Sequence, residues 1–217
     1  DPAWTAPWQD PQNTAPFPNT TQTFQTNSSS LKFNGVDDYI QSSDSGFPLG
    51  SSNRTAEAWI YTKVYTSPLS HIVHYGSGLT GSSWGLVLNA NGGLLAHEWN
   101  VYQAAGTVPL NQWAHIVITL SPGGVKKHYI NGVNIGQTNY TPNTVSSGLA
   151  RIGARVSTPA EFFNGFIDDV RIYNRALTKN EIGAHYYHSK CARPGDNCDV
   201  LSDPGCRNAC GVYAQSN

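Results

Sequence analysis

Short runs of alternating apolar and polar residues recur along residues 29–187, and Gly, Asn or Pro separates them at intervals of about ten residues. This spacing is typical of the antiparallel strands of an all-β sandwich. Asn131-Gly132 stands between two such runs and favours a tight hairpin, because both central residues of a type I′ turn need a positive φ. We therefore predict strands at residues 31–33, 39–40, 56–64, 84–88, 94–99, 113–120, 125–130, 133–136, 150–152 and 162–173.

One stretch after the last predicted strand has the pattern of a helix. Thr178 can cap its first turn, and Glu181 follows three residues later, as in a capping box. Leu177, Ile182 and Tyr186 could then share one face of the helix. The sequence therefore predicts one short C-terminal helix.

Two segments flank this β-rich region. Residues 1–28 are rich in Pro, Thr, Gln and Asn and have no strand or helix period, but they contain several large aromatic residues. We predict an extended arm, which either lies over the domain surface or docks on a neighbouring copy of the chain. Residues 188–217 form a Cys-rich tail. The predicted organisation is thus an arm, a sandwich at residues 29–187 and a tail.

The charge balance excludes several classes of partner. Charged residues make up 12% of the chain, and 13 Lys and Arg nearly cancel 14 Asp and Glu to leave a net charge of -1. Binding to nucleic acid is not expected, because neutralising phosphates needs clustered basic residues. Membrane insertion is not expected either, since no apolar run approaches the roughly 20 residues of a spanning helix.

Cysteines and glycosylation motifs indicate a secreted, extracellular chain. Four cysteines lie in one short segment and favour two disulfides, for which three pairings are possible; they are Cys191, Cys198, Cys206 and Cys210. Four N-x-Ser/Thr motifs lie in predicted loops and could carry N-linked glycans; their asparagines are Asn19, Asn27, Asn53 and Asn139.

Four segments, in this order, resemble the laminin-G-like branch of the concanavalin A-like lectin/glucanase superfamily. They are residues 31–40 (LKFNGVDDYI), 56–60 (AEAWI), 113–117 (WAHIV) with 129–132 (YING), and 163–177 (FNGFIDDVRIYNRAL). The resemblance implies a jelly roll of two antiparallel sheets with its first and last segments side by side and its helix packed at the edge. It does not fix the function, because such a fold hosts lectins, adhesion modules, enzymes and spacers.

Two acidic pairs are candidate metal ligands. Asp37 and Asp38 follow the Asn34-Gly35 turn, and Asp168 and Asp169 precede the end of the last predicted strand. If the resemblance places these segments side by side, their carboxylates could converge on calcium, which prefers oxygen ligands. The alternative is that these residues cap turns and pair with nearby arginines.

A stretch at residues 97–103 mixes aromatic and polar side chains. Such a mixture suits sugar binding, in which flat rings stack on the C–H faces of pyranoses and polar groups bind the hydroxyls. The predicted carbohydrate-binding residues are Trp84, His97, Trp99, Asn100 and Tyr102. The alternative is a half-buried strand and its turn. The resemblance assigns Trp59 and Trp113 to packing.

Zinc binding and catalysis have weaker support. His71 and His74 are three residues apart, a spacing that puts them on opposite faces of a regular strand. His185 and His188 could share a face only if the predicted helix continues. The Glu-x-Asp-x-x-Glu pattern of the superfamily's glucanases is absent, and no other catalytic motif is present, so we expect a protein that is not an enzyme.

The sequence therefore favours a recognition module that binds glycans or extracellular glycoproteins, with calcium as a candidate cofactor. The alternative is a structural subunit of an extracellular coat, fibre or appendage, assembled when the arm of residues 1–28 docks on the next copy.

Overall fold

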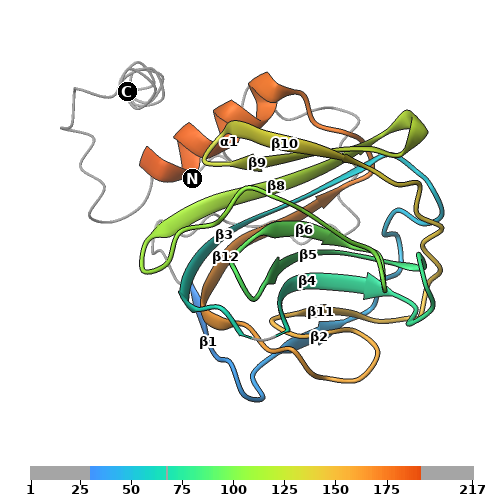
Figure 1. Cartoon of the computed structure of the whole chain (residues 1–217), viewed down its shortest axis with the longest axis horizontal. Coiled ribbons are helices and arrows are strands. Elements are labelled where there is room, and N and C mark those ends of the chain that lie inside the picture. Colours follow the sequence, from blue (N-terminus) through green and yellow to red (C-terminus); the bar gives the residue numbers. More distant parts are fainter. Residues whose placement is uncertain (1–29, 67, 192–217) are drawn as a thin grey trace, which may run out of the picture.

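The computed structural model describes residues 30–66 and 68–191, which form two six-stranded antiparallel sheets packed face to face (Figure 1). The first sheet has the order β1-β12-β3-β8-β9-β10, and its strands are β1 (Leu31–Asn34), β12 (Asn164–Tyr173), β3 (Arg54–Val64), β8 (Trp113–Ser121), β9 (Val125–Ile130) and β10 (Val133–Asn139). The second sheet has the order β2-β11-β4-β5-β6-β7, and its strands are β2 (Ile40–Ser42), β11 (Ala150–Ile152), β4 (Leu69–Gly76), β5 (Ser83–Asn89), β6 (Leu94–His97) and β7 (Tyr102–Ala105). The predicted all-β, two-sheet jelly-roll sandwich is confirmed.

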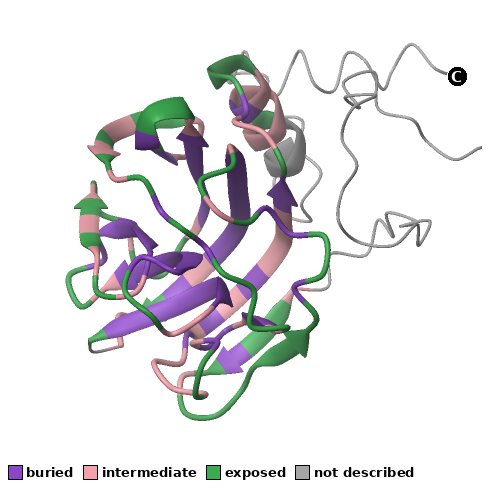
Figure 2. Cartoon of the chain, turned by 90° about the vertical axis from the view of Figure 1, so that its right-hand side faces the viewer, coloured by how far each residue is buried: buried purple, intermediate pink, exposed green. Residues whose placement is uncertain are grey.

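The core lies between the two sheets, where the inward residues of each strand meet. Every second residue of β3 contributes to it, from Ala56 through Ala58 to Ile60, and Leu86 and Leu88 of β5 face them from the second sheet. Figure 2 shows that buried residues run along the central strands, while much of the exposed surface lies in the connecting loops. Burial of this apolar surface is the main stabilising contribution to the sandwich.

The register confirms that the first and last segments of the resemblance are neighbours. β1 pairs with β12 from Leu31 opposite Ile167 to Asn34 opposite Asn164. The two strands that the sequence analysis did not predict, β4 and β7, belong to the second sheet. A short 3-10 turn, η1 (Pro122–Gly124), joins β8 to β9.

The predicted helix forms as α1 (Lys179–Cys191) and covers the outer face of the first sheet (Figure 1). The capping box is present: Glu181 Oε2 accepts a bond of 2.7 Å from the Thr178 amide, and the Glu181 amide donates to Thr178 Oγ1 at 3.3 Å. Ile182 is fully buried, and the Tyr186 ring stacks on Trp59 at 5.7 Å. Within the described ranges no helix is long and apolar enough to cross a membrane.

Several predictions concern residues outside the described ranges. The arm of residues 1–28, Asn19 and Asn27, and the disulfides of the tail are among them, and they stay predictions. The helix α1 continues to Cys191, and the predicted division into arm, sandwich and tail stays a prediction. Asn53 is half-buried before β3 and Asn139 is exposed at the end of β10, and glycosylation of either stays a prediction.

Candidate functional site

Three histidines meet on the outer face of the second sheet, away from the core. His97 ends β6, and its neighbour Ala96 belongs to the core, so His97 points outward. In β4 the register shifts between His71 and Val73, and both Ile72 and Val73 reach the core. This bulge corrects the expectation that His71 and His74 lie on opposite faces, because the extra residue brings both to the outer face.

The histidine rings are close enough to interact directly. His71 Nε2 lies 3.4 Å from His97 Nδ1, and His97 Nδ1 lies 3.2 Å from His74 Nε2. Burial lowers the pKa of His71 and of His74 well below the usual value of an imidazole, and it lowers the pKa of His97 to about 4. All three rings are therefore neutral at physiological pH.

The loop between β11 and β12 covers this histidine cluster. The Val156 amide donates to His74 Nδ1 at 3.1 Å, and the His71 amide donates to the Glu161 carbonyl at 3.2 Å. Glu161 also faces His71 Nδ1 at 3.5 Å and pairs with Arg155 at 3.6 Å. As a result His71 and His74 are fully buried, and His97 is only 2% exposed.

An aromatic surface lies directly above His97. The turn after β6 has left-handed backbone at Trp99 (φ 41°) and Asn100 (φ 60°), so the strand alternation ends at His97. Trp99 lies 6.1 Å from the His97 ring on one side, and Tyr102 lies opposite His97 in the register with its ring 5.5 Å away. Arg155 stacks on Trp99 at 5.3 Å.

This surface is accessible to solvent. Tyr102 is 60% exposed, Trp99 is half-buried, and Asn100 is exposed, with its amide donating to Thr80 Oγ1 at 3.2 Å. The Gly81 amide donates to the carbonyls of Glu98 and Trp99 and so fixes the turn against the preceding loop. The structure thus brings four of the five predicted carbohydrate-binding residues together: His97, Trp99, Asn100 and Tyr102.

Trp84 is not part of this surface, and its assignment as a sugar platform is corrected. It lies in the core with no solvent exposure, under the Arg54 guanidinium at 5.3 Å. Trp59 is 3% exposed under α1, as a packing role requires. Trp113 is half-buried beside Tyr61 and Phe166.

The two acidic pairs do not converge. Asp37 and Asp38 fold back on Asn34, whose Oδ1 accepts both their backbone amides and whose own groups donate to both carboxylates. The register puts Asp168 beyond Leu31, at the opposite end of β1 and roughly 13 Å along the strand from the position opposite Asn34. The expected four-carboxylate corner is therefore corrected, and calcium as a cofactor stays a prediction.

The remaining pair has a local role. The Asp169 amide donates to Asp168 Oδ1 at 2.8 Å within a bulge of β12, where Asp169 itself has a φ of 50°. Arg171 lies 3.4 Å from the Asp169 carboxylate. The turn-and-arginine alternative fits these contacts.

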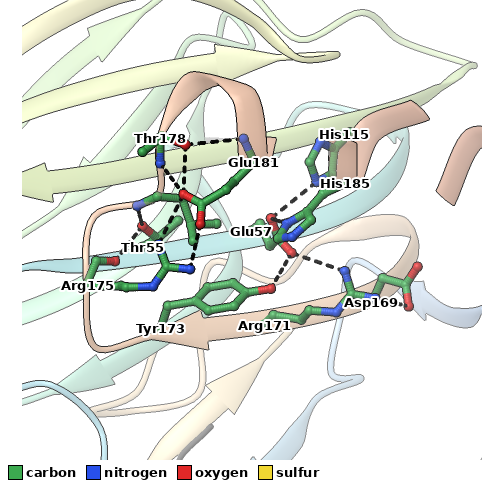
Figure 3. Close-up of polar contacts among 11 residues, drawn as sticks. Thr55, Glu57, His115, Asp169, Arg171, Tyr173, Arg175, Thr178, Glu181 and His185 are labelled. Atoms are coloured by element: carbon green, nitrogen blue, oxygen red, sulfur yellow. Dashed lines mark hydrogen bonds and ion pairs between the residues drawn. The ribbon is translucent and has the colours of Figure 1, made fainter. Parts of the chain in front are cut away.

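A buried network under α1 escaped the sequence analysis (Figure 3). The fully buried Glu57 carboxylate accepts bonds from Tyr173 Oη at 2.9 Å and Arg171 Nη1 at 3.1 Å, and it lies 3.0 Å from His185 Nδ1. Burial alone would raise the pKa of Glu57, but the bonds from His115 and His185 and the charge of Arg171 hold that pKa well below its usual value. The network joins the helix, through His185, to the strands of the first sheet.

The family follows from the sequence pattern and the fold together. Residues 34–183 match the Laminin_G_3 model, described as the concanavalin A-like lectin/glucanases superfamily. The chain belongs to this family. The match runs from the last residue of β1 to the start of α1 in this laminin-G-like domain. No curated protein matches the chain significantly.

Solved structures with the same fold include domains that were studied with bound sugars. Domain 4 of an extracellular GH43 arabinanase from Geobacillus stearothermophilus, in complex with arabinotriose, is 22% identical over 71% of this chain and 74% of that chain, with a TM-score of 0.56. The CBM40 of a Ruminococcus gnavus IT-sialidase, bound to α2,3-sialyllactose, is 17% identical over 72% of this chain and 98% of that chain, with a TM-score of 0.53.

A larger enzyme also contains the fold. The Trypanosoma rangeli sialidase is 18% identical over 76% of this chain, with a TM-score of 0.56, but the laminin-G-like domain spans only 28% of that enzyme. At these identities the likeness establishes the fold alone.

Proposed function

We propose that this laminin-G-like domain is an extracellular carbohydrate-binding module that binds glycans at Trp99, Asn100 and Tyr102. The observation that carries the proposal is the pair of accessible aromatic rings, Trp99 and Tyr102, that both lie within about 6 Å of the His97 ring, with Arg155 stacked on Trp99. Aromatic rings bind the apolar faces of sugars, and amide and guanidinium groups bind hydroxyl or carboxylate substituents. The arabinanase domain and the CBM40 module, both with this fold, are described in complex with oligosaccharides.

The ion pairs of the glutamates are consistent with a protein that binds sugars without cleaving them. All four glutamates of the chain are described, and each lies in an ion pair with a basic side chain: Glu57 with Arg171, Glu98 with Lys126, Glu161 with Arg155 and Glu181 with Arg175. Glycosidases use a pair of Asp or Glu carboxyl groups, one as acid and one as nucleophile or base, and the chain lacks the Glu-x-Asp-x-x-Glu pattern of the superfamily's glucanases. We therefore propose a non-enzymatic module.

A glycan array with the full chain is the first test, and it should include arabino-oligosaccharides and sialylated glycans. We expect binding to at least one class of oligosaccharide. Running the array with and without added calcium tests the calcium prediction at the same time. An absence of binding to every glycan would contradict the proposal.

Calorimetry with variants then locates the site. Trp99→Ala and Tyr102→Ala should each weaken binding about 10-fold, which corresponds to about 1.4 kcal/mol of lost stacking. Trp113→Ala is the matched control, since it removes another half-buried tryptophan from the opposite sheet. Unchanged affinity in the first two variants, or a loss confined to Trp113→Ala, would place the site elsewhere.

A further inference from the structure

The histidine cluster beneath the aromatic surface has the geometry of a metal centre. The facing nitrogens of His71, His74 and His97 all lie within 4.8 Å of one another, and these residues form the one such group of potential ligands in the part of the chain that the structure describes. Two of the three nitrogen separations are 3.2 and 3.4 Å. Zinc–imidazole bonds of 2.0–2.1 Å in a tetrahedral site require ligand nitrogens about 3.3–3.4 Å apart.

The surroundings of His71 match the second shell of a histidine ligand. A histidine that binds metal through one nitrogen usually donates the other N–H to a carboxylate or carbonyl, which fixes its tautomer. His71 Nδ1 faces Glu161 Oε2 at 3.5 Å, and neither atom has a hydrogen-bond partner within the described ranges. With its proton on Nδ1, His71 presents the lone pair of Nε2 to the cluster.

His74 sets the proton balance of the centre. Its Nδ1 accepts a hydrogen bond from the Val156 amide, so its neutral ring carries the proton on Nε2 and donates it to His97 Nδ1. Three nitrogens therefore surround one proton. A cation that binds there replaces this proton, and His74 then binds as an anionic ring or gives up its bond to Val156.

Ligand chemistry selects the class of ion. Two basic groups act on the cluster: Arg155, which is paired with Glu161, and Arg151, which lies opposite His74 in the register and binds Gln41 Oε1 and the Val156 carbonyl. Neutral imidazoles suit zinc, copper, nickel and iron rather than calcium or magnesium, which prefer oxygen. Three protein ligands also leave a fourth position for water or for an atom of a bound molecule.

We propose that His71, His74 and His97 form a binding site for a divalent transition-metal ion, with zinc as the expected occupant. This proposal does not depend on glycan binding, because the metal is measured alone. A metal at this place would link β4 to β6 through His97, whose ring contacts Trp99 and Tyr102.

The test is zinc binding to the full chain after treatment with a chelator, measured by competition with a chromophoric chelator. We expect one zinc per chain, and X-ray absorption at the zinc edge should show three imidazole nitrogens at about 2.0–2.1 Å. This spectrum needs no variant. Sulfur neighbours at about 2.3 Å would instead place the metal in the Cys-rich tail and overturn the proposal.

Variants provide a second readout. His71→Gln and His97→Gln should each weaken zinc binding at least about 100-fold, and Glu161→Gln should weaken it about 10–100-fold. His128→Gln is the matched control, because His128 is equally buried but lies outside the cluster, where it binds Thr138 Oγ1 at 2.9 Å. Wild-type affinity in both cluster variants, or no stoichiometric zinc in the wild-type chain, would overturn the proposal.

Discussion

The buried Glu57 network should control how firmly α1 is attached, and Glu57→Gln tests this. The substitution keeps the volume of the side chain but removes the charge that Arg171, Tyr173 and His185 all contact. Breaking a buried ion pair costs about 3–5 kcal/mol when the other charge is left without compensation. Arg171 is 30% exposed and retains Asp169, so we expect a loss near the lower limit, about 3 kcal/mol.

The assay is thermal and urea unfolding of the full chain. A loss of about 3 kcal/mol should lower the Tm by about 6–12 °C in a chain of this size. Glu181→Gln is the matched control: its ion pair with Arg175 is about one-third exposed, and its loss should cost no more than about 1 kcal/mol. A Glu57→Gln variant within about 0.5 kcal/mol of the wild type would refute the reasoning.

The same network predicts a pH dependence. The pKa of Glu57 is lower in the folded chain than its usual value, so its stabilisation is present above that value and is lost as the pH falls toward the folded pKa. The wild type should therefore lose stability as the pH falls below about 5, and Glu57→Gln should reduce this slope. Two parallel curves of unfolding free energy against pH would contradict the assignment.

Two further substitutions test the second sheet and its support. Lys126→Met should lower the unfolding free energy by about 3 kcal/mol, because it leaves the Glu98 carboxylate buried without its partner at 2.6 Å. The double variant with Glu98→Leu should recover most of this loss. Additive losses in the double-mutant cycle would contradict the prediction. Gly85→Ala should lower the unfolding free energy by about 1–3 kcal/mol and disturb the histidine cluster, because the new Cβ would lie 2.4 Å from the Val73 carbonyl oxygen and 2.8 Å from His74 Cδ2. If the variant unfolds in urea like the wild type, the two strands can move apart there and the prediction is wrong.

Most of the fold could be predicted because its signals are local. The alternation in β3, the hairpin at Asn131-Gly132 and the capping box of α1 each depend on residues close together in the sequence, and all three appear in the structure. The strand β4 was missed for an equally local reason. Its bulge places Ile72 and Val73 in the core together, so the sequence there has no regular alternation.

The candidate sites depend on longer-range placement, and this explains the mixed outcome. Trp99 and Tyr102 were predicted together because they lie in one short stretch of aromatic and polar residues, 97–103. Trp84 was grouped with them by residue type, but its position in β5 alternates into the core between Ser83 and Gly85. The acidic pairs depend on a register that no local pattern specifies: β1 pairs with β12 so that Asn34 lies opposite Asn164, four residues before Asp168.

The histidine cluster and the Glu57 network lie on opposite outer faces of the sandwich, and they differ in whether their polar groups are complementary. Around Glu57 every facing group is a donor or a cation, so the charge is satisfied within the protein and the network needs nothing more. Around His97 Nδ1 the facing atoms are two more imidazole nitrogens, and the three nitrogens have a single proton between them, the one on His74 Nε2. Buried polar groups persist when they have partners. The first arrangement is complete as a structural support, whereas the second is completed by a cation, and its position under Trp99 and Tyr102 connects that cation to the surface on which a glycan would rest.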